Sequence, residues 1–222
     1  MERVVQLTDR ELAEVAARLE DAPAGEIVRW AADTFRDRLC LTASMADAVL
    51  IDVATRVAPD VEVLFIDTGY HFPETLETVD HVRRRYHPNL RVLDARVPLD
   101  DRWKIDTDGC CAARKVAPLE EALAGRDAWM SGLRRADDPS RADTPIVSRD
   151  RRGLVKVNPL ATWSDADVDA YVAEHDVVTN PLLQRGYPSI GCWPCTRAVG
   201  PGEDARAGRW SGSTKTECGL HL

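Results

Sequence analysis

The stretch that decides the fold runs from residue 61 to residue 73 and reads VEVLFIDTGYHFP. Its first six residues, Val61 to Ile66, are mostly β-branched or apolar, which predicts a buried strand. The glycine and proline that follow mark a loop at the carboxyl end of that strand. A helix from Glu74 to about Tyr86 and a strand from Leu90 to about Asp94 come next. Because strands and helices alternate, we expect a parallel sheet with right-handed crossovers.

The same alternation extends in both directions from this unit. Further strands are expected at Leu39–Ala43, Asp127–Gly132 and Leu154–Val157. A helix is expected from a capping box at Thr8 to about Glu20, and a second one follows the break at Asp21–Gly25 and runs to about Phe35. Further helices are expected from Ala48 to about Val57, around Pro118–Leu123, and from the Ser164 cap to about His175. Residues 97–109 are expected to be irregular, with the helix opening at the cysteine pair that follows them. The prediction is an α/β fold, a mostly parallel twisted sheet with helices on both faces.

Three segments are expected along the chain. Residues 1–36 form an N-terminal helical segment packed on the main domain, and residues 37–200 form the α/β domain. From about Asn180 onward, glycine, proline and isolated polar residues replace the periodic pattern. Residues 201–222 are therefore expected to form a flexible C-terminal tail.

Composition narrows the class of protein. With 222 residues, 44% of them hydrophobic and 30% charged, the chain can bury a core and is typical of soluble globular proteins. No apolar run reaches membrane-spanning length and no signal-peptide stretch is present, so no membrane contact is expected. The net charge of −8 argues against general nucleic-acid binding. Six unevenly spaced cysteines indicate a reduced, cytoplasmic compartment rather than a disulfide scaffold.

Four of the cysteines form two closely spaced pairs. Cys110 and Cys111 are adjacent, which is poor geometry for a mutual disulfide but suits metal ligation by soft thiolates. Cys192 and Cys195 have the Cys-x-x-Cys spacing of two thiolates that converge on one metal centre. Four thiolates could close a structural zinc site or hold one cubane iron–sulfur cluster, and the vicinal pair favours the cluster.

The two remaining cysteines have different surroundings. Cys40 lies inside an expected buried strand and is interpreted as a small core residue. Cys218 lies near the end of the chain, where packing gives little reason for a cysteine. Lys215 and His221 are near enough in sequence to favour its thiolate, so a reactive thiol is expected there.

Three short segments fall at the expected ligand edge of the sheet, beyond the carboxyl ends of its strands. Residues 43–47 lead into a helix N-terminus, which is either a plain connection or an anion site. Asp67-Thr68-Gly69 is either a strand-end turn or a contact for adenosine or ribose. Arg134-Arg135, directly after a strand, is either part of a solvated loop or an anion site.

Together these segments resemble the assimilatory adenylyl-sulfate (APS) reductases, the iron–sulfur branch of the PAPS/APS reductase family. The resemblance covers the chain from about Leu39 to its end. It rests on IDTGYHF at 66–72, CCAARK at 110–115, GLRR at 132–135, YPSIGCWPC at 187–195, GRW at 208–210 and ECGLH at 217–221. The cysteine set and the tail motif make it specific.

The resemblance implies an adenine nucleotide α-hydrolase-like fold and one [4Fe-4S] cluster on the four paired cysteines. It also implies reduction of adenosine 5′-phosphosulfate to sulfite and AMP, with thioredoxin as electron donor, in sulfate assimilation and cysteine biosynthesis. Residues 37–200 would then be the nucleotide-binding reductase domain. One feature departs from the family pattern, whose nucleotide loop often carries Ser-Gly near its start. Here residues 42–47 read TASMAD, in which Asp47 holds the matching acidic position.

This activity gives roles to particular residues. The anionic substrate requires cations, and arginine can bind its oxygens in a fork. The candidates are Lys115, Arg134, Arg135, Arg206 and Arg209. The Cys218 thiolate would attack the sulfate sulfur and expel AMP, and thioredoxin would then release sulfite from S-sulfonated Cys218. The tail would close for the first step and open for the second. His221 either orients the tail or is merely exposed, and the cluster is expected to be structural and electrostatic.

Three alternatives accompany this interpretation. A reductase of 3′-phosphoadenylyl sulfate would use the same mechanism, but the cluster cysteines favour the unphosphorylated substrate. A nucleic-acid-binding module with zinc on the four paired cysteines would explain those cysteines and the arginine-rich loop, but the acidic net charge and the tail cysteine argue against it. A tRNA sulfur-transferase would need an intact ATP-binding loop, which this sequence lacks. A homo-oligomer is compatible with the sequence but not indicated by it.

Overall fold

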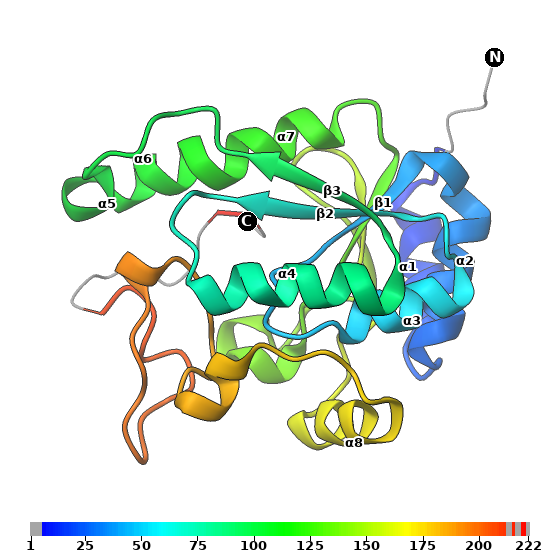
Figure 1. Ribbon diagram of the computed structural model, residues 1–222. Helices are drawn as coiled ribbons and strands as arrows, with labels where there is room; N and C mark the ends of the chain where they lie inside the picture. Colours follow the sequence, from blue (N-terminus) through cyan, green and yellow to red (C-terminus); the bar gives the residue numbers. More distant parts are fainter. Residues whose placement is uncertain (1–5, 212–214, 216–218, 221–222) are drawn as a thin grey trace.

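A six-stranded sheet forms the centre of the structure, a computed structural model that describes residues 6–211, 215 and 219–220. The strands follow the order β3-β2-β1-β4-β6-β5 (Figure 1). Their bounds are β1 Leu39–Thr42, β2 Glu62–Asp67, β3 Asn89–Asp94, β4 Ala128–Ser131, β5 Val147–Arg149 and β6 Val155–Val157. Neighbours from β3 to β6 pair in parallel, while β5 pairs antiparallel with β6. The predicted mostly parallel sheet is confirmed.

Strand β5 is absent from the sequence-based prediction. It has three residues, Val147 to Arg149, too few to show an alternating pattern. Tertiary contacts keep it at the sheet edge. Arg149 Nε donates to an Asp9 carboxylate oxygen at 2.8 Å, and its Nη1 donates to the Gly153 carbonyl oxygen at 3.0 Å.

Helices cover both faces of the sheet, as predicted (Figure 1). Their bounds are α1 Asp9–Leu19, α2 Ala24–Phe35, α3 Val49–Val57, α4 Pro73–Tyr86, α5 Arg102–Ile105, α6 Thr107–Cys111, α7 Ala117–Leu123 and α8 Asp165–His175. The capping box expected at Thr8 and the cap expected at Ser164 are both present, and the Ser164 cap is itself a capping box with Asp167. Within the described residues, no helix has the length and apolar character needed to cross a bilayer.

Alternating strand residues face two separate hydrophobic clusters. Leu41 and Val63 face the larger one, to which α1, α2 and α3 contribute. Cys40 and Leu64 face the smaller one, which α7 covers. Cys40 is 0% exposed, and burial raises the pKa of its thiol to about 12. Its interpretation as a small core residue is therefore confirmed.

The helix that carries the vicinal cysteines begins earlier than predicted. The stretch expected to be irregular contains α5 and the start of α6. The Asp106 side chain accepts the Gly109 N–H at 2.8 Å and so caps α6. From α6 the helix continues through a π-helical segment, η2 (Ala112–Val116), into α7. We call residues 107–123 the cysteine helix, since Cys110 and Cys111 lie inside this run rather than at its opening.

The direction in which the chain adds strands reverses beside β1. From β1 it moves to β2 and β3, and it then returns to place β4 on the other side of β1. Crevices at such reversals are the usual ligand sites of open α/β sheets. The loops that follow β1 and β4, which carry Asp47 and Arg134, flank this crevice.

A buried carboxylate ties α8 to α3. Asp52 is 3% exposed and accepts hydrogen bonds from Arg56 Nε and the Tyr171 hydroxyl, both at 2.7 Å. Burial, together with the bond to Asp52, raises the pKa of Tyr171. Because α8 has no fully buried residue, the Tyr171 hydroxyl adds a polar link to the apolar contacts that Val168 and Val172 make with the core.

His71 packs back onto β2 from the loop that follows the strand. Its Nε2 lies 2.8 Å from the Ile66 carbonyl oxygen, and its ring lies 4.9 Å from that of Phe65. Burial lowers the pKa of His71. The hydrogen bond with Ile66 and the charge of Asp67 oppose this shift, whereas the charge of Lys115 adds to it. The folded protein therefore favours the neutral imidazole.

We expect Tyr171→Phe to lower the free energy of unfolding by about 1–2 kcal/mol, because Asp52 loses a donor while staying buried. Calorimetric comparison of the Tm with that of the unmodified protein measures the loss. Tyr187→Phe is the matched control, since the Tyr187 ring packs against Phe72 and its hydroxyl bonds to no described residue. An equal loss in both variants would contradict the role given to Asp52.

We expect the stability that neutral His71 provides to be complete above about pH 6.5 and to decline as the pH falls towards its lowered folded-state pKa. The reason is that the unfolded chain binds the proton more readily than the folded chain. Urea-unfolding midpoints from pH 8 to pH 5.5 should fall less steeply for His71→Gln than for the unmodified protein. His81→Gln, on an exposed part of α4, controls for loss of an imidazole. Parallel profiles for the unmodified and His71→Gln proteins would refute this expectation.

Candidate functional site

Four cysteines from two distant segments line one pocket. Cys110 and Cys111 come from the cysteine helix, and Cys192 and Cys195 come from the loop around the short helix η6 (Trp193–Cys195). The other lining residues are Tyr70, Trp103, Thr107, Arg114, Lys115, Pro194, Arg209 and Trp210. The fold therefore brings together all four cysteines that the sequence analysis paired as metal ligands. We call this the cysteine pocket.

The loop after β2 holds the Cys-x-x-Cys segment in place. The Thr68 hydroxyl lies 3.3 Å from Cys192 Sγ, and the Tyr70 carbonyl oxygen accepts the Trp193 N–H at 2.8 Å. The shape of this loop requires glycine at position 69. Its φ is +75°, which glycine adopts without strain, and a Cβ added here would lie only 2.8 Å from a Leu99 methyl carbon. Thr68 and Gly69, expected to contact adenosine or ribose, thus lie beside the cysteine pocket.

Arg114 connects the cysteine helix to the same loop. It is 3% exposed, and its guanidinium donates to the carbonyl oxygens of Thr68 at 3.2 Å, of Val97 at 3.4 Å and of Pro98. It also lies 4.6 Å from the Tyr70 ring centroid. Arg114 is therefore a positioning residue, which holds the loop after β2 against the cysteine helix.

Different features of the pocket raise and lower the pKa values of its thiols. Burial, followed by the neighbouring Cys192, raises the pKa values of Cys110 and Cys195. Lys115 opposes the shift at both thiols, Arg114 at Cys110 and Arg209 at Cys195. A bound metal centre would favour the thiolates further, because metal ligation deprotonates a thiol.

The chemistry of the pocket fits an iron–sulfur cluster. Its donors are four soft sulfurs, and three cations stand among the lining residues to offset thiolate charge. In the described parts of the chain, no three His, Cys, Asp or Glu side chains are grouped closely enough to hold a single metal ion.

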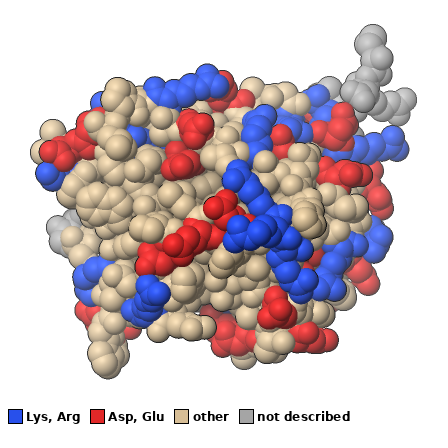
Figure 2. Space-filling view, viewed as in Figure 1, with Lys and Arg blue, Asp and Glu red and all other residues tan. Residues whose placement is uncertain are grey.

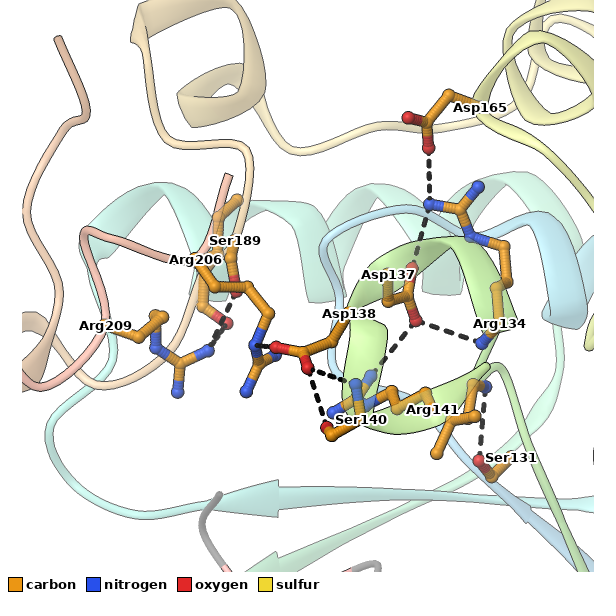
Figure 3. Close-up of polar contacts among 12 residues, drawn as sticks. Ser131, Arg134, Asp137, Asp138, Ser140, Arg141, Asp165, Ser189, Arg206 and Arg209 are labelled. Atoms are coloured by element: carbon orange, nitrogen blue, oxygen red, sulfur yellow. Dashed lines mark hydrogen bonds and ion pairs between the residues drawn. The ribbon is translucent and has the colours of Figure 1, made fainter. Parts of the chain in front are cut away.

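Asp47 and Arg134 flank the crevice at the switch point. Burial raises the pKa of Asp47, while the Val49 N–H, 3.0 Å from its carboxylate, and the charge of Arg134 lower it. Arg134 Nη2 lies 2.9 Å from both an Asp137 and an Asp165 carboxylate oxygen (Figure 3). Its buried Nη1 has no hydrogen-bond partner among the described residues, so one strong donor is available to an anion there.

Met45 lies in the loop before Asp47, where the sequence departs from the Ser-Gly pattern of the family. Met45 has a φ of 62°, in the left-handed region, and is 0% exposed. A non-glycine residue there costs about 1–2 kcal/mol, which burial of the methionine side chain can offset. Asn180 braces the loop by donating from Nδ2 to the Met45 carbonyl oxygen at 3.2 Å and from its backbone N–H to the Ala46 carbonyl oxygen at 2.9 Å.

Two further arginines point towards the same region from residues 201–211, the described first part of the segment expected to form the tail. Arg206 Nε lies 2.9 Å from an Asp138 carboxylate oxygen, and Arg209 Nη1 donates to the Ser189 hydroxyl at 3.2 Å (Figure 3). The Arg209 guanidinium also lies where a side chain on Gly191 would collide with it, since a Cβ there would be 2.4 Å from Nη2. Arg209 is thereby held at the rim of the cysteine pocket.

The structure does not bring Arg135 into this group. Its Nε donates to the Thr144 carbonyl oxygen at 2.8 Å, and its Nη2 donates to Glu20 at 3.0 Å, just beyond α1. Asp67 is at the end of β2, where its carboxylate accepts the Gly69 N–H at 2.8 Å and shapes the turn. Both have a structural explanation in this fold.

Two of the predicted site residues lie outside the described part of the chain, and two residues that line the pocket were not predicted. Cys218 and His221 are not among the described residues, whereas Lys215 is, with its ammonium against the Asp108 carboxylate. Trp103 and Thr107 line the pocket but lie in the stretch expected to be irregular. The sequence signal for α6, which contains Thr107, is Asp106, a residue type that often caps a helix N-terminus.

Trp193 is partly exposed to solvent. A buried position is the ordinary expectation for an indole beside paired cysteines, but the Trp193 side chain is 49% exposed and packs edge-on against Tyr70 and Trp103. Proline follows it, and the short η6 turn directs the cysteines rather than the indole inward.

Comparisons with known proteins extend over nearly the whole chain. The Phosphoadenosine phosphosulfate reductase domain matches residues 38–198. The adenosine 5′-phosphosulfate reductase of Streptomyces coelicolor is 56% identical over 223 residues, covering 95% of this chain and 93% of that protein. The Mycolicibacterium smegmatis protein of the same name is 43% identical over 235 residues, covering 100% of both.

Solved structures agree with these relatives. The phosphoadenylyl-sulfate (PAPS) reductase from Candida auris, in a phosphate complex, has a TM-score of 0.77 and 29% identity, covering 89% of this chain and 100% of that one. The FMN adenylyltransferase of Candida glabrata, at 12% identity and a TM-score of 0.59 over 87% of this chain and 69% of that one, shares the fold alone. The expected α/β fold, similar to that of adenine nucleotide α-hydrolases, is thus confirmed. The chain belongs to the phosphoadenosine phosphosulfate reductase family, whose members are oxidoreductases that act on sulfur groups.

Proposed function

We propose that this protein reduces adenosine 5′-phosphosulfate to sulfite and AMP with thioredoxin as electron donor. The observation that carries the proposal is the convergence of four cysteines with Lys115 and Arg209 in one pocket, in a chain whose relatives over its full length are named for that substrate. The activity would operate in sulfate assimilation and cysteine biosynthesis, in the cytoplasm.

One [4Fe-4S] cluster is the proposed cofactor. Cys110, Cys111, Cys192 and Cys195 would hold it, and Thr68 would hydrogen-bond to one ligand sulfur. When bound, the cluster supplies a rigid, negatively charged anchor for the pocket and passes no electron to the substrate. Lys115 would stand between this charge and the substrate sulfate.

The substrate's anionic groups would be bound by the cations at the carboxyl edge of the sheet. Arg134 offers its unpaired Nη1 beside Asp47, and Arg206 and Arg209 approach from the other side (Figure 3). Guanidinium groups suit phosphate and sulfate because they donate two parallel hydrogen bonds. The turn at Asp67 is the proposed neighbour of the adenosine. Arg135 is the weakest member of the predicted set, since Glu20 and Thr144 engage its guanidinium.

The proposed reaction has two displacement steps at sulfur. The Cys218 thiolate forms a bond to the sulfate sulfur, and the bond from that sulfur to the AMP phosphate oxygen breaks, so AMP leaves with the electron pair. A thioredoxin thiolate then attacks Cys218 Sγ, and sulfite leaves with the bonding electrons. The second thioredoxin thiol resolves the mixed disulfide and returns the Cys218 thiolate. Two electrons pass from the dithiol to sulfur, with His221 proposed to orient the tail.

The 3′-phosphorylated nucleotide is a second candidate substrate, because the similar structure from Candida auris is that of a phosphoadenylyl-sulfate (PAPS) reductase. The vicinal cysteines and the relatives' names favour the unphosphorylated nucleotide for this chain. The nucleic-acid-binding alternative has less support, since the net charge is −8 and Figure 2 shows acidic and basic side chains interspersed over the face in view. Rates of sulfite release from the two nucleotides decide between the substrates.

We expect the unmodified protein, given sulfur-labelled substrate and no thioredoxin, to retain label and release AMP. Cys218→Ser should retain no label, because it lacks the proposed nucleophile. Cys40→Ala is the matched control, since Cys40 is fully buried away from the pocket and should leave labelling intact. Tryptic mass spectrometry locates the label. Label retained by Cys218→Ser would refute the proposed intermediate.

We expect anaerobically purified protein to contain about four iron atoms and as many sulfides per chain, with broad absorption at the blue end of the visible range. Cys111→Ser should lose most of this iron and sulfite production with it, because the pocket loses one of four thiolates. Cys40→Ala should keep the full iron content. Zinc at one atom per chain with no iron would contradict the cluster.

A further inference from the structure

Two adjacent carboxylates in the loop after β4 hold two arginines that come from different parts of the chain. An Asp137 carboxylate oxygen lies 2.9 Å from Nη2 of Arg134, which belongs to the same loop. An Asp138 carboxylate oxygen, Oδ2, lies 2.9 Å from Nε of Arg206, which comes from a distant segment (Figure 3). Two consecutive residues therefore fix two of the cations that we propose for the substrate's anionic groups.

Ser140 sets the orientation of the Asp138 carboxylate. The Ser140 N–H donates to Asp138 Oδ1 at 2.8 Å, and the Ser140 hydroxyl donates to the same oxygen at 2.7 Å. Through the first of these bonds Asp138 caps the short helix η4 (Pro139–Arg141). Because both bonds engage Oδ1, the carboxylate presents Oδ2 to Arg206 Nε. The acceptor for Arg206 is thus held in place by the loop itself.

The Asp138 carboxylate is ionised at neutral pH. Hydrogen bonds from Ser140 lower its pKa most, burial opposes them, and the charges of Arg206 and Arg141 lower the pKa further. The ion pair is also sheltered, since the Arg206 side chain is 13% exposed and that of Asp138 is 21% exposed. Salt screens such a pair less than it screens a pair on the open surface. The contact can therefore hold the Arg206 guanidinium in one orientation.

Capping of η4 does not require the charge of Asp138. A helix cap needs only a side-chain oxygen that accepts a backbone N–H, and asparagine supplies one as well as aspartate does. The negative charge is needed for the ion pair with Arg206, because a charge-assisted hydrogen bond is roughly twice as strong as a neutral one. Asp138→Asn therefore separates the role in the cap from the role in holding Arg206.

We propose that Asp138 is a positioning residue that directs the Arg206 guanidinium towards the phosphate of the nucleotide, across the crevice from Arg134. The inference rests on the proposed function, because it takes the nucleotide to be the ligand of Arg206. It adds a carboxylate that acts on substrate affinity without touching the substrate. An arginine that is held before the ligand arrives loses less side-chain entropy on binding, so the carboxylate strengthens the binding of an anion.

The binding test compares AMP with adenosine by isothermal titration calorimetry on the anaerobically purified, full-length protein. Asp138→Asn should weaken AMP binding about fivefold, because Arg206 is no longer held towards the phosphate. Adenosine has no phosphate and should bind the variant and the unmodified protein equally. Asp143→Asn is the matched control, since Asp143 is exposed on the same loop and forms no ion pair within the described residues. It should bind AMP with unchanged affinity.

A double-mutant cycle tests whether Asp138 acts through Arg206. In an Arg206→Ala background, Asp138→Asn should change AMP affinity by less than about twofold, because the side chain that it positions is gone. A loss that persists in full without Arg206 would overturn the inference. So would unchanged AMP affinity in Asp138→Asn alone, or an equal loss of adenosine affinity, which would indicate a general distortion of the site.

The same measurements keep this inference apart from the proposed function. If Asp138→Asn weakens AMP binding through Arg206 but the unmodified protein releases no sulfite, the proposed reaction fails while the role of Asp138 stands. If the unmodified protein releases sulfite and Asp138→Asn binds AMP as tightly as it does, the role of Asp138 fails alone. An unmodified protein that binds no AMP would overturn both.

Discussion

The buried guanidinium of Arg114 keeps the two halves of the cysteine pocket in register. A charge that is only 3% exposed is stable because carbonyl oxygens surround it and an Asp100 carboxylate oxygen lies 3.7 Å from its Nη2. Leaving such a charged group without these partners would cost more than about 1–3 kcal/mol. One of those carbonyls belongs to Thr68, whose hydroxyl meets Cys192. Docking of the cysteine helix and placement of the second cysteine pair are therefore coupled through one loop. The convergence of the four sulfurs depends on this link.

The arginines around the crevice follow a common pattern, because most of them are held by carboxylates. Arg134 pairs with Asp137 and Asp165, and Arg206 pairs with Asp138. Such pairing fixes long side chains in place, which lowers the entropy that binding an anion would otherwise cost. It also limits the net positive charge of the crevice.

Most of the sheet could be predicted because most strands, and the helices that follow them, have local sequence patterns: short apolar runs for strands and capping residues for helices. The residues from Val61 to Ile66 form β2 within one residue of the expected bounds, and the caps at Thr8 and Ser164 lie where the capping box predicts them. The elements that were not predicted lack such local patterns. Strand β5 has only three residues, and its Arg149 is held by Asp9 of the distant helix α1. Helices α5 and α6 lie in a polar stretch without a helical pattern of apolar residues, where the Asp106 cap is the local signal of α6.

The sequence by itself determined the chemistry: which residues are soft ligands, which are cations, and that the segments alternate into a parallel sheet. Adjacent cysteines and a Cys-x-x-Cys pair are local patterns, and their affinity for metal is a property of the thiolates themselves. Only the tertiary structure decided which side chains meet. It brought Thr68 to Cys192, seated Leu220 beside α7, and committed Arg135 to Glu20 rather than to the crevice. These outcomes depend on packing between elements far apart in the chain, where a side chain's partner is set by geometry that no local pattern encodes.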